Sequence, residues 1–170
     1  MEILLDQIVD LGYGRMHFAV PEVGFVAGEK AFRGLTNGIC GAAVPGFLLL
    51  GTGLRHGDVG LRFELHDAEP ALDDEWEDVV EVSWASIAPN LLVRGPDDVD
   101  PEPVALPRGD YRVRFCGVGM QEGFDEESSD GEPPLDRYLL AFWPAPAAGD
   151  RIVRTTSAVA ARHHRTFRNS

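Results

Sequence analysis

Carboxylates are the groups in this sequence best placed to do chemistry, because they are numerous and gathered together. The 170 residues include 28 Asp and Glu against 15 Lys and Arg, which gives a net charge of −13. Eight of the acids lie between residues 67 and 81, four between 97 and 102, and seven between 122 and 136. A surface with this charge repels nucleic acid and speeds association with basic proteins. The charge therefore predicts a basic protein partner and argues against a nucleic-acid partner.

Two aromatic residues stand inside these acidic segments. Trp76 and Phe124 are flanked by carboxylates, and aromatic side chains commonly supply the strongest contacts of a protein interface. We predict a partner-binding surface in which carboxylates pair with Lys and Arg of the partner while Trp76 is buried at the centre. The predicted surface consists of Asp73, Asp74, Glu75, Trp76, Glu77, Asp78, Phe124, Asp125, Glu126 and Glu127.

Such a surface favours a non-catalytic function, that of an inhibitor or immunity protein masking a basic nuclease or toxin. A plainer interpretation is an accessory domain with no dedicated site, in which the acidic loops keep the protein soluble and Trp76 covers the core. The two interpretations differ in one measurable respect. Electrostatic binding of a basic protein weakens as salt is added, because salt screens exposed charges.

Recognisable motifs for catalysis or metal binding are absent from the sequence. The five histidines form no HxH, HxxxH or HExxH pair, and no GxSxG motif occurs. The acidic segments also lack the twelve-residue spacing and central glycine of a calcium loop. We therefore predict no catalytic residue, no metal and no cofactor. One alternative stays open, a small-molecule or metal-dependent jelly-roll enzyme in which His66 acts with Asp67 or Glu69.

The two cysteines, Cys40 and Cys116, have neither CxxC spacing nor a cluster of metal ligands around them. Cysteine is among the most frequently buried residue types, so we predict two buried free thiols. A disulfide between them is the alternative.

The clearest structural signal is a pair of strands near the end of the chain. Tyr111, Val113 and Phe115 alternate with Arg112, Arg114 and Cys116, which places aromatic and branched side chains on one face of a strand. In the segment 138–143 both alternating sets are apolar, as expected of a central strand covered on both sides. We predict that these are neighbouring strands joined by a long acidic loop, 121–135.

Further strands are expected along the rest of the chain, with turn residues between them. Alternating or continuous apolar runs predict them at 3–9, 15–20, 47–54, 59–66, 79–84, 87–94 and 151–156. Ser157 is placed to cap a final helix over 158–165. We predict a mainly β protein, an antiparallel β-sandwich of jelly-roll or immunoglobulin-like character with a short C-terminal helix. Residues 1–170 are expected to form a single domain, with a tail from about 157 that is helical or flexible.

The start of the chain, MEILLDQIVDLGYG, contains acidic groups and lacks the basic region and cleavage site of a secretory signal. No apolar run approaches the roughly 20 residues that cross a bilayer. We expect a cytoplasmic, bacterial protein with no membrane partner, and the sequence leaves its oligomeric state open.

The strand pair also resembles a known family. The run LPRGDYRVRFC, Leu106–Cys116, follows acidic loops and precedes the strand at Tyr138–Trp143, and in this it is similar to the C-terminal part of the competence protein J family. An opening strand with Tyr13, His17 and Phe18, and a glycine–alanine segment at Gly38–Ala43, occur in a similar order. Members of that family are small acidic bacterial proteins that inhibit a DNA-entry nuclease. The resemblance implies an inhibitor and assigns no site residue.

Overall fold

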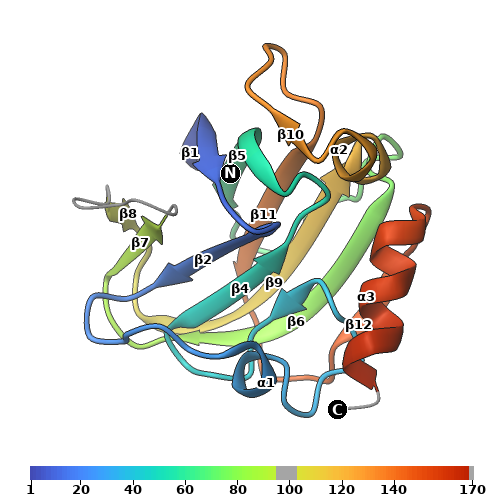
Figure 1. Cartoon of the computed structure of the whole chain (residues 1–170). Coiled ribbons are helices and arrows are strands. Elements are labelled where there is room, and N and C mark those ends of the chain that lie inside the picture. Colours follow the sequence, from blue (N-terminus) through green and yellow to red (C-terminus); the bar gives the residue numbers. More distant parts are fainter. Residues whose placement is uncertain (95–102, 169–170) are drawn as a thin grey trace.

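The computed structural model describes residues 1–94 and 103–168, and these form two stacked β-sheets with three helices (Figure 1). The acidic segment predicted at 97–102 lies outside the described residues. The candidate site lies on the larger sheet. Its strands lie in the order β1 (Glu2–Leu11), β5 (His56–Leu65), β11 (Arg137–Pro144), β9 (Gly109–Val118), β6 (Asp78–Ser86) and β12 (Arg151–Arg154), and the short β10 (Ser128–Ser129) also pairs with β5.

The smaller sheet covers one face of the larger one. Its strands lie in the order β3 (Cys40–Gly41), β4 (Phe47–Gly51), β2 (Arg15–Ala19), β7 (Asn90–Arg94) and β8 (Pro103–Ala105). The main core lies between the two sheets. For example, the ring of Phe18 on β2 packs edge-on against Phe63 on β5 with 5.1 Å between centroids. The prediction of a mainly β fold is confirmed.

The prediction that the strands of the central pair are neighbours is confirmed. β9 and β11 run antiparallel from Arg137 opposite Val118 to Pro144 opposite Tyr111. The inward-facing side chains of the pair, such as Phe115 and Leu140, are fully buried. Their outward-facing neighbours form the floor of the candidate site.

The expectation of a purely antiparallel arrangement is wrong for the larger sheet. β11 pairs with β5 in parallel, from Arg137 opposite Gly60 to Phe142 opposite Leu65, and β10 is also parallel to β5. Parallel neighbours need a long crossover between them, and here the chain passes through β6 and β9 before β11 joins β5. The sheet is therefore mixed, and a jelly-roll or immunoglobulin-like strand order stays a prediction.

Helices account for a small part of the chain. α1 (Gly28–Ala31) is a single turn, and α3 (Ala158–Arg168) is the predicted C-terminal helix. Ser157 caps α3 as expected, because its hydroxyl accepts a hydrogen bond of 3.0 Å from the Ala160 amide. The segment 121–135 is not only a loop, since it contains most of α2 (Met120–Glu126). Gly123, a poor helix former, obscures that helix in the sequence.

The prediction of free, buried thiols is confirmed for both cysteines. Burial raises the pKa of Cys116 to about 12 and raises the pKa of Cys40 further still. A thiol that stays protonated at neutral pH is a poor nucleophile, so neither cysteine is a candidate for covalent chemistry.

Candidate functional groove

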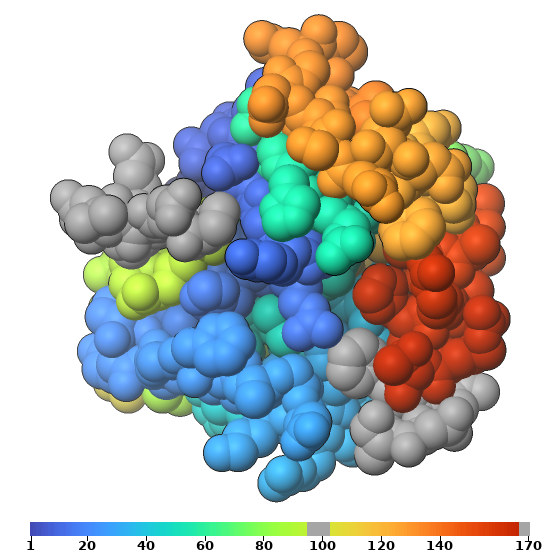
Figure 2. All heavy atoms as spheres, in the orientation of Figure 1, coloured from blue at the N-terminus to red at the C-terminus, as the bar shows by residue number. Residues whose placement is uncertain are grey.

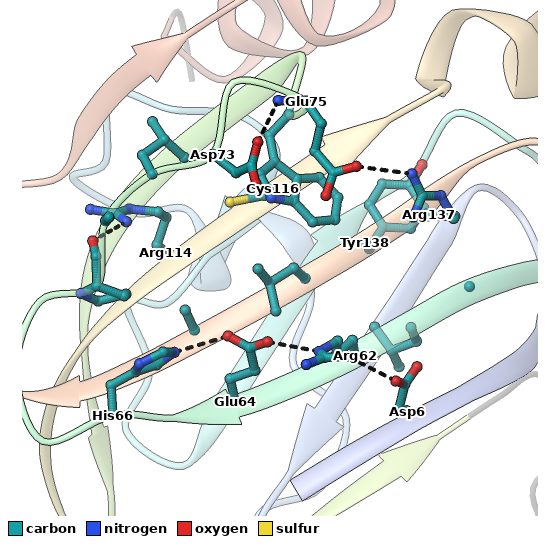
Figure 3. Close-up of a pocket in the computed structure, with 18 residues that line it drawn as sticks. Asp6, Arg62, Glu64, His66, Asp73, Glu75, Arg114, Cys116, Arg137 and Tyr138 are labelled. Carbon is teal, nitrogen blue, oxygen red and sulfur yellow. Dashed lines mark hydrogen bonds and ion pairs between the residues drawn. The ribbon is translucent and has the colours of Figure 1, made fainter. Parts of the chain in front are cut away.

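A groove of about 480 Å³ lies on the outer face of the larger sheet (Figure 3). Its floor consists of the outward-facing side chains of β5, β11 and β9, and one wall is the loop between β5 and β6, residues 66–77. We call these residues the 66–77 loop. Gly60 keeps the floor open beneath Arg137, since a Cβ built on Gly60 would lie 3.1 Å from the Arg137 Cγ. The groove is rich in charged groups and has an apolar base.

One side of the groove is a continuous row of ion pairs along β5 (Figure 3). Arg62 lies between two carboxylates, with its Nη1 3.0 Å from Asp6 and its Nε 2.7 Å from Glu64. The other oxygen of Glu64 lies 2.9 Å from Nε2 of His66. The alternation of β5 puts Arg62, Glu64 and His66 on the same outer face. Each carboxylate in this row already has a cationic or imidazole partner.

Arg114 on β9 attaches the 66–77 loop to the sheet. Its side chain is 6% exposed, and its Nε donates to Glu81 on β6 at 2.9 Å. Its two other nitrogens reach the loop, Nη1 donating to the Pro70 carbonyl at 2.7 Å and Nη2 to Glu69 at 3.0 Å. The guanidinium also lies 5.3 Å from the ring centre of Trp143. A buried arginine requires such a set of acceptors, because an unpaired charge in the interior is very costly.

Trp76 is part of this attachment and not an exposed anchor. Its side chain is 9% exposed and packs with Val79 and Cys116 in a separate small core on the outer face. Arg154 on β12 donates to its carbonyl, and the Arg137 guanidinium lies 6.0 Å from its ring centre. The prediction that Trp76 inserts into a partner is corrected, because its apolar surface is already covered by the sheet.

The other predicted residues of this segment also have partners within the chain. Asp74 lies 3.5 Å from Arg154 and Glu75 lies 3.5 Å from Arg137, while Asp73 accepts a hydrogen bond from the Glu75 amide. These three side chains are exposed. The remaining two, Glu77 and Asp78, are held by backbone amides.

Asp78 is fully buried and accepts hydrogen bonds from the Thr156 and Ser157 amides at 2.8 and 3.1 Å. It therefore positions the start of α3, and its predicted role in partner binding is corrected. Glu77 accepts from the Gly119 amide at 3.1 Å, just before α2 begins. This contact brings two acidic segments that are distant in sequence next to each other.

The second set of predicted residues lies on and after α2, beside α3 (Figure 2). Phe124 is half-buried against the main core, and the Arg162 guanidinium lies 4.4 Å from its ring centre. Asp125, Glu126 and Glu127 are exposed. In Figure 2, α2 lies beside α3, and the orange segment that follows it, around β10, projects from the body of the molecule. Its acidic groups are therefore presented to solvent.

We call this exposed acidic region the α2–β10 surface. Within the described residues, no ion pair involves any of its carboxylates. It consists of Glu122, Asp125, Glu126, Glu127, Asp130 and Glu132, all exposed.

A buried polar network fixes the segment carrying this surface to the sheet. Asp136 is fully buried and accepts a hydrogen bond of 2.5 Å from the Tyr138 hydroxyl and one of 3.0 Å from the Leu54 amide. Tyr138 also accepts from the Gly53 amide at 2.8 Å. Burial raises the pKa of Asp136 despite these hydrogen bonds, and burial beside Asp136 raises the pKa of Tyr138 well above its ordinary value.

Gly123 of α2 lies directly over this network. A Cβ at Gly123 would come within 3.0 Å of the Asp136 carboxyl and 2.8 Å of the Leu54 nitrogen. The helix can approach so closely only because residue 123 has no side chain. The burial of Asp136 was not predictable from the sequence, because it is one of seven carboxylates between residues 122 and 136 and nothing in its residue type distinguishes it from the exposed ones.

Two signals in the sequence could have indicated the groove. Arg112 and Arg114 alternate onto the outer face of a strand that is otherwise apolar, so each requires an acidic partner from elsewhere. Leu72 and Trp76 interrupt an acidic run four residues apart, as expected of a segment that packs down on an apolar surface. Neither signal says which strands are neighbours.

The alternative site at His66 is not assembled. His66 contacts Glu64, while Glu69 pairs with Arg114. Among the described residues, no group of three or more His, Cys, Asp or Glu is arranged to hold a metal ion. No helix in the described part of the chain is long and apolar enough to span a membrane.

Comparison with solved structures shows a related fold. The crystal structure of ComJ, inhibitor of the DNA degrading activity of NucA, from Bacillus subtilis, superposes with a TM-score of 0.54 and 17% identity, over 85% of this chain and 98% of ComJ. The chain is similar in fold to ComJ. A protein described as crocagin biosynthetic gene J gives a TM-score of 0.57 and 18% identity over the same shares of each chain.

The resemblance to the competence protein J family, drawn from Leu106–Cys116 and its surroundings, is thus confirmed at the level of the fold. No family model matches the chain, and no curated protein matches it significantly.

Proposed function

We propose that this chain is a single-domain, non-catalytic inhibitor or immunity protein that binds a basic nuclease in the bacterial cytoplasm. The observation that carries the proposal is the fold likeness to ComJ, which extends over 98% of that chain. The net charge of −13 supports the same conclusion, because enzymes that act on DNA contact its phosphates through Lys and Arg.

The proposed mechanism is occlusion of the nuclease's DNA-binding surface. The α2–β10 surface supplies carboxylates that are exposed and have no ion-pair partner among the described residues, so they bind a cationic surface without first breaking ion pairs within the chain. Asp73, Asp74 and Glu75 lie on the adjoining 66–77 loop, connected through the Glu77–Gly119 contact. The chain would thereby compete with DNA for the same cationic groups.

The test is inhibition of DNA digestion by a panel of purified bacterial nucleases that includes NucA. We expect one nuclease to be inhibited at equimolar protein, with inhibition weakening as salt rises from about 50 mM to about 500 mM. Failure to inhibit any nuclease at a large molar excess, or inhibition unaffected by salt, would contradict the proposal.

A further inference from the structure

A two-residue turn joins β1 to β2, and its first residue is Tyr13 (Figure 1). Both central residues have a left-handed backbone, with φ of 61° at Tyr13 and 67° at Gly14. A turn of this type favours Asn, Asp or Gly, because a bulky side chain is disfavoured in that conformation. The side chain of Tyr13 is nevertheless 78% exposed. Burial in the core therefore does not explain an aromatic residue at this position.

The turn is fixed against the start of β5. The Gly14 amide donates to the Arg55 carbonyl at 2.9 Å, and the Thr52 amide donates to the Gly14 carbonyl at 3.0 Å. The Tyr13 ring lies nearly perpendicular to the ring of His56, with 5.2 Å between their centroids. An edge-on contact covers at most one face of a ring, so at least one face of Tyr13 stays accessible.

His56 connects this turn to the α2–β10 surface. The amides of Arg55 and His56 both donate to the Glu127 carbonyl at 3.1 Å, and Ser128 of β10 pairs with His56 of β5. In the described part of the chain, Tyr13 and Glu127 are the non-glycine residues with positive φ. Both contact His56, and residues held in such unfavourable conformations concentrate at functional sites.

A depression of about 450 Å³ lies between the turn and the segment that begins at β10. Its lining includes Tyr13, Ser128 and Asp130, the last an exposed carboxylate of the α2–β10 surface. No described Lys or Arg lines it. An aromatic ring and a carboxylate together suit a guanidinium group, which stacks its plane on the ring and pairs its edge with the carboxylate. The chemistry of the depression therefore favours an arginine side chain.

We propose that this depression receives an arginine side chain of the basic nuclease, with the guanidinium against the Tyr13 ring and paired with Asp130. The proposal rests on the proposed function and extends its interface from the α2–β10 surface to the turn. It also supplies the aromatic contact that the buried Trp76 cannot provide. Tyrosine and arginine are among the residues that contribute most to the binding energy of protein interfaces.

The probe is a capped Gly-Arg-Gly peptide, titrated into isotope-labelled protein and followed by NMR without any nuclease. The matched control is the same peptide with citrulline, which has the shape of arginine but no charge. We expect the largest shifts at the amides of Tyr13, His56 and Ser128, and about fivefold weaker binding of the citrulline peptide. Largest shifts elsewhere on the acidic surface, or equal binding of the two peptides, would overturn the proposal.

The variant Tyr13→Asn separates binding from stability. Asn adopts a left-handed backbone more readily than Tyr, so the melting temperature should be unchanged or higher, while the arginine peptide should bind about fivefold more weakly. Tyr13→Phe keeps the ring and should retain most of the binding. Asp130→Asn changes an exposed side chain and should weaken binding about threefold. Unchanged binding by Tyr13→Asn or by Asp130→Asn would reject the assigned contacts.

Inhibition measurements distinguish this site from the proposed function. With a nuclease that the wild type inhibits, Tyr13→Asn should raise the concentration needed for half-maximal inhibition by about tenfold. Binding of the arginine peptide without inhibition of any nuclease would reject the inhibitory function and support the site. Inhibition that Tyr13→Asn leaves unchanged would reject Tyr13 as an interface residue.

Discussion

The 66–77 loop and the segment 120–136 are both rich in carboxylates, yet their surroundings in the folded chain differ. In the 66–77 loop, Glu69, Asp74 and Glu75 each pair with an arginine from a distant strand. On the α2–β10 surface, no carboxylate is in an ion pair with a described residue, and all are exposed. Two segments with similar numbers of carboxylates, six and seven, therefore have different roles in the folded chain. One segment neutralises the arginines of the outer sheet face, and the other presents its charge to solvent.

The attachment of each segment differs in the same way. The 66–77 loop is held by charged contacts, chiefly those of Arg114, and by the burial of Trp76. The segment 120–136 is held by the hydrogen-bonded network of Asp136 and Tyr138 beneath α2. The following substitutions separate these contributions.

The largest expected effect comes from Arg114→Met. The substitution leaves the nearly buried Glu81 without one of its arginine partners, and the loop without its contacts at Glu69 and Pro70. We expect unfolding in urea to require about 3 kcal/mol less free energy. This is the low end of the range for breaking a buried pair, because Arg151 still contacts Glu81 at 2.8 Å.

The matched control is Arg137→Met in the same groove. Arg137 and Glu75 are each about half exposed, so the loss should stay below about 0.5 kcal/mol. Equal losses for the two arginine variants would show that burial does not distinguish them.

Tyr138→Phe tests the attachment of the segment 120–136. Removing the hydroxyl leaves the Gly53 amide without its acceptor and takes one hydrogen bond from the buried Asp136 carboxyl, which keeps the one from the Leu54 amide. We expect a loss of about 2 kcal/mol in unfolding free energy. Amides of α2 should exchange faster in hydrogen-exchange measurements. Tyr111→Phe is the control, since its hydroxyl makes a single partly buried contact with the Pro107 carbonyl. A larger loss at Tyr111 would contradict the role of the network.

Two triple substitutions compare the two segments as binding surfaces. Asp125→Asn with Glu126→Gln and Glu127→Gln should slow association with an inhibited nuclease about tenfold. Asp73→Asn with Asp74→Asn and Glu75→Gln removes the same charge but frees Arg137 and Arg154, and should slow it by about threefold. Stopped-flow or surface-binding measurements at low salt give both rates. If the substitutions at 73–75 slowed association more than those at 125–127, the interface would lie on the 66–77 loop instead.

The smallest effect is expected at Asp150, a carboxylate outside both segments. Burial would raise its pKa, but hydrogen bonds from Asn37 and Thr36 outweigh burial and lower it below the ordinary 3.8. A lowered pKa contributes stability above the ordinary value and loses it as the pH falls through the folded value. The difference in unfolding free energy between the wild type and Asp150→Asn should therefore be constant above about pH 5 and disappear at lower pH. A difference that grows on acidification would contradict this sign.

Much of the local structure could be predicted from the sequence alone. The alternation in Tyr111–Cys116 and the apolar run at 138–143 identified two neighbouring strands, and Ser157 identified the start of a helix. The burial of both cysteines also followed from residue type and context. These features depend on side chains a few residues apart, whose relative positions the period of a strand or helix determines.

Only the tertiary structure decided which strands and charges are neighbours. Alternation assigns a side chain to a face but not a strand to a partner, so the parallel pairing of β5 with β11 was not predictable. The partners of Arg114 lie 33 and 45 residues away in the chain, and the burial of Trp76 depends on the same folding of the 66–77 loop. A carboxylate that pairs within the chain and one that faces solvent are identical in sequence. They differ only in what the fold places beside them.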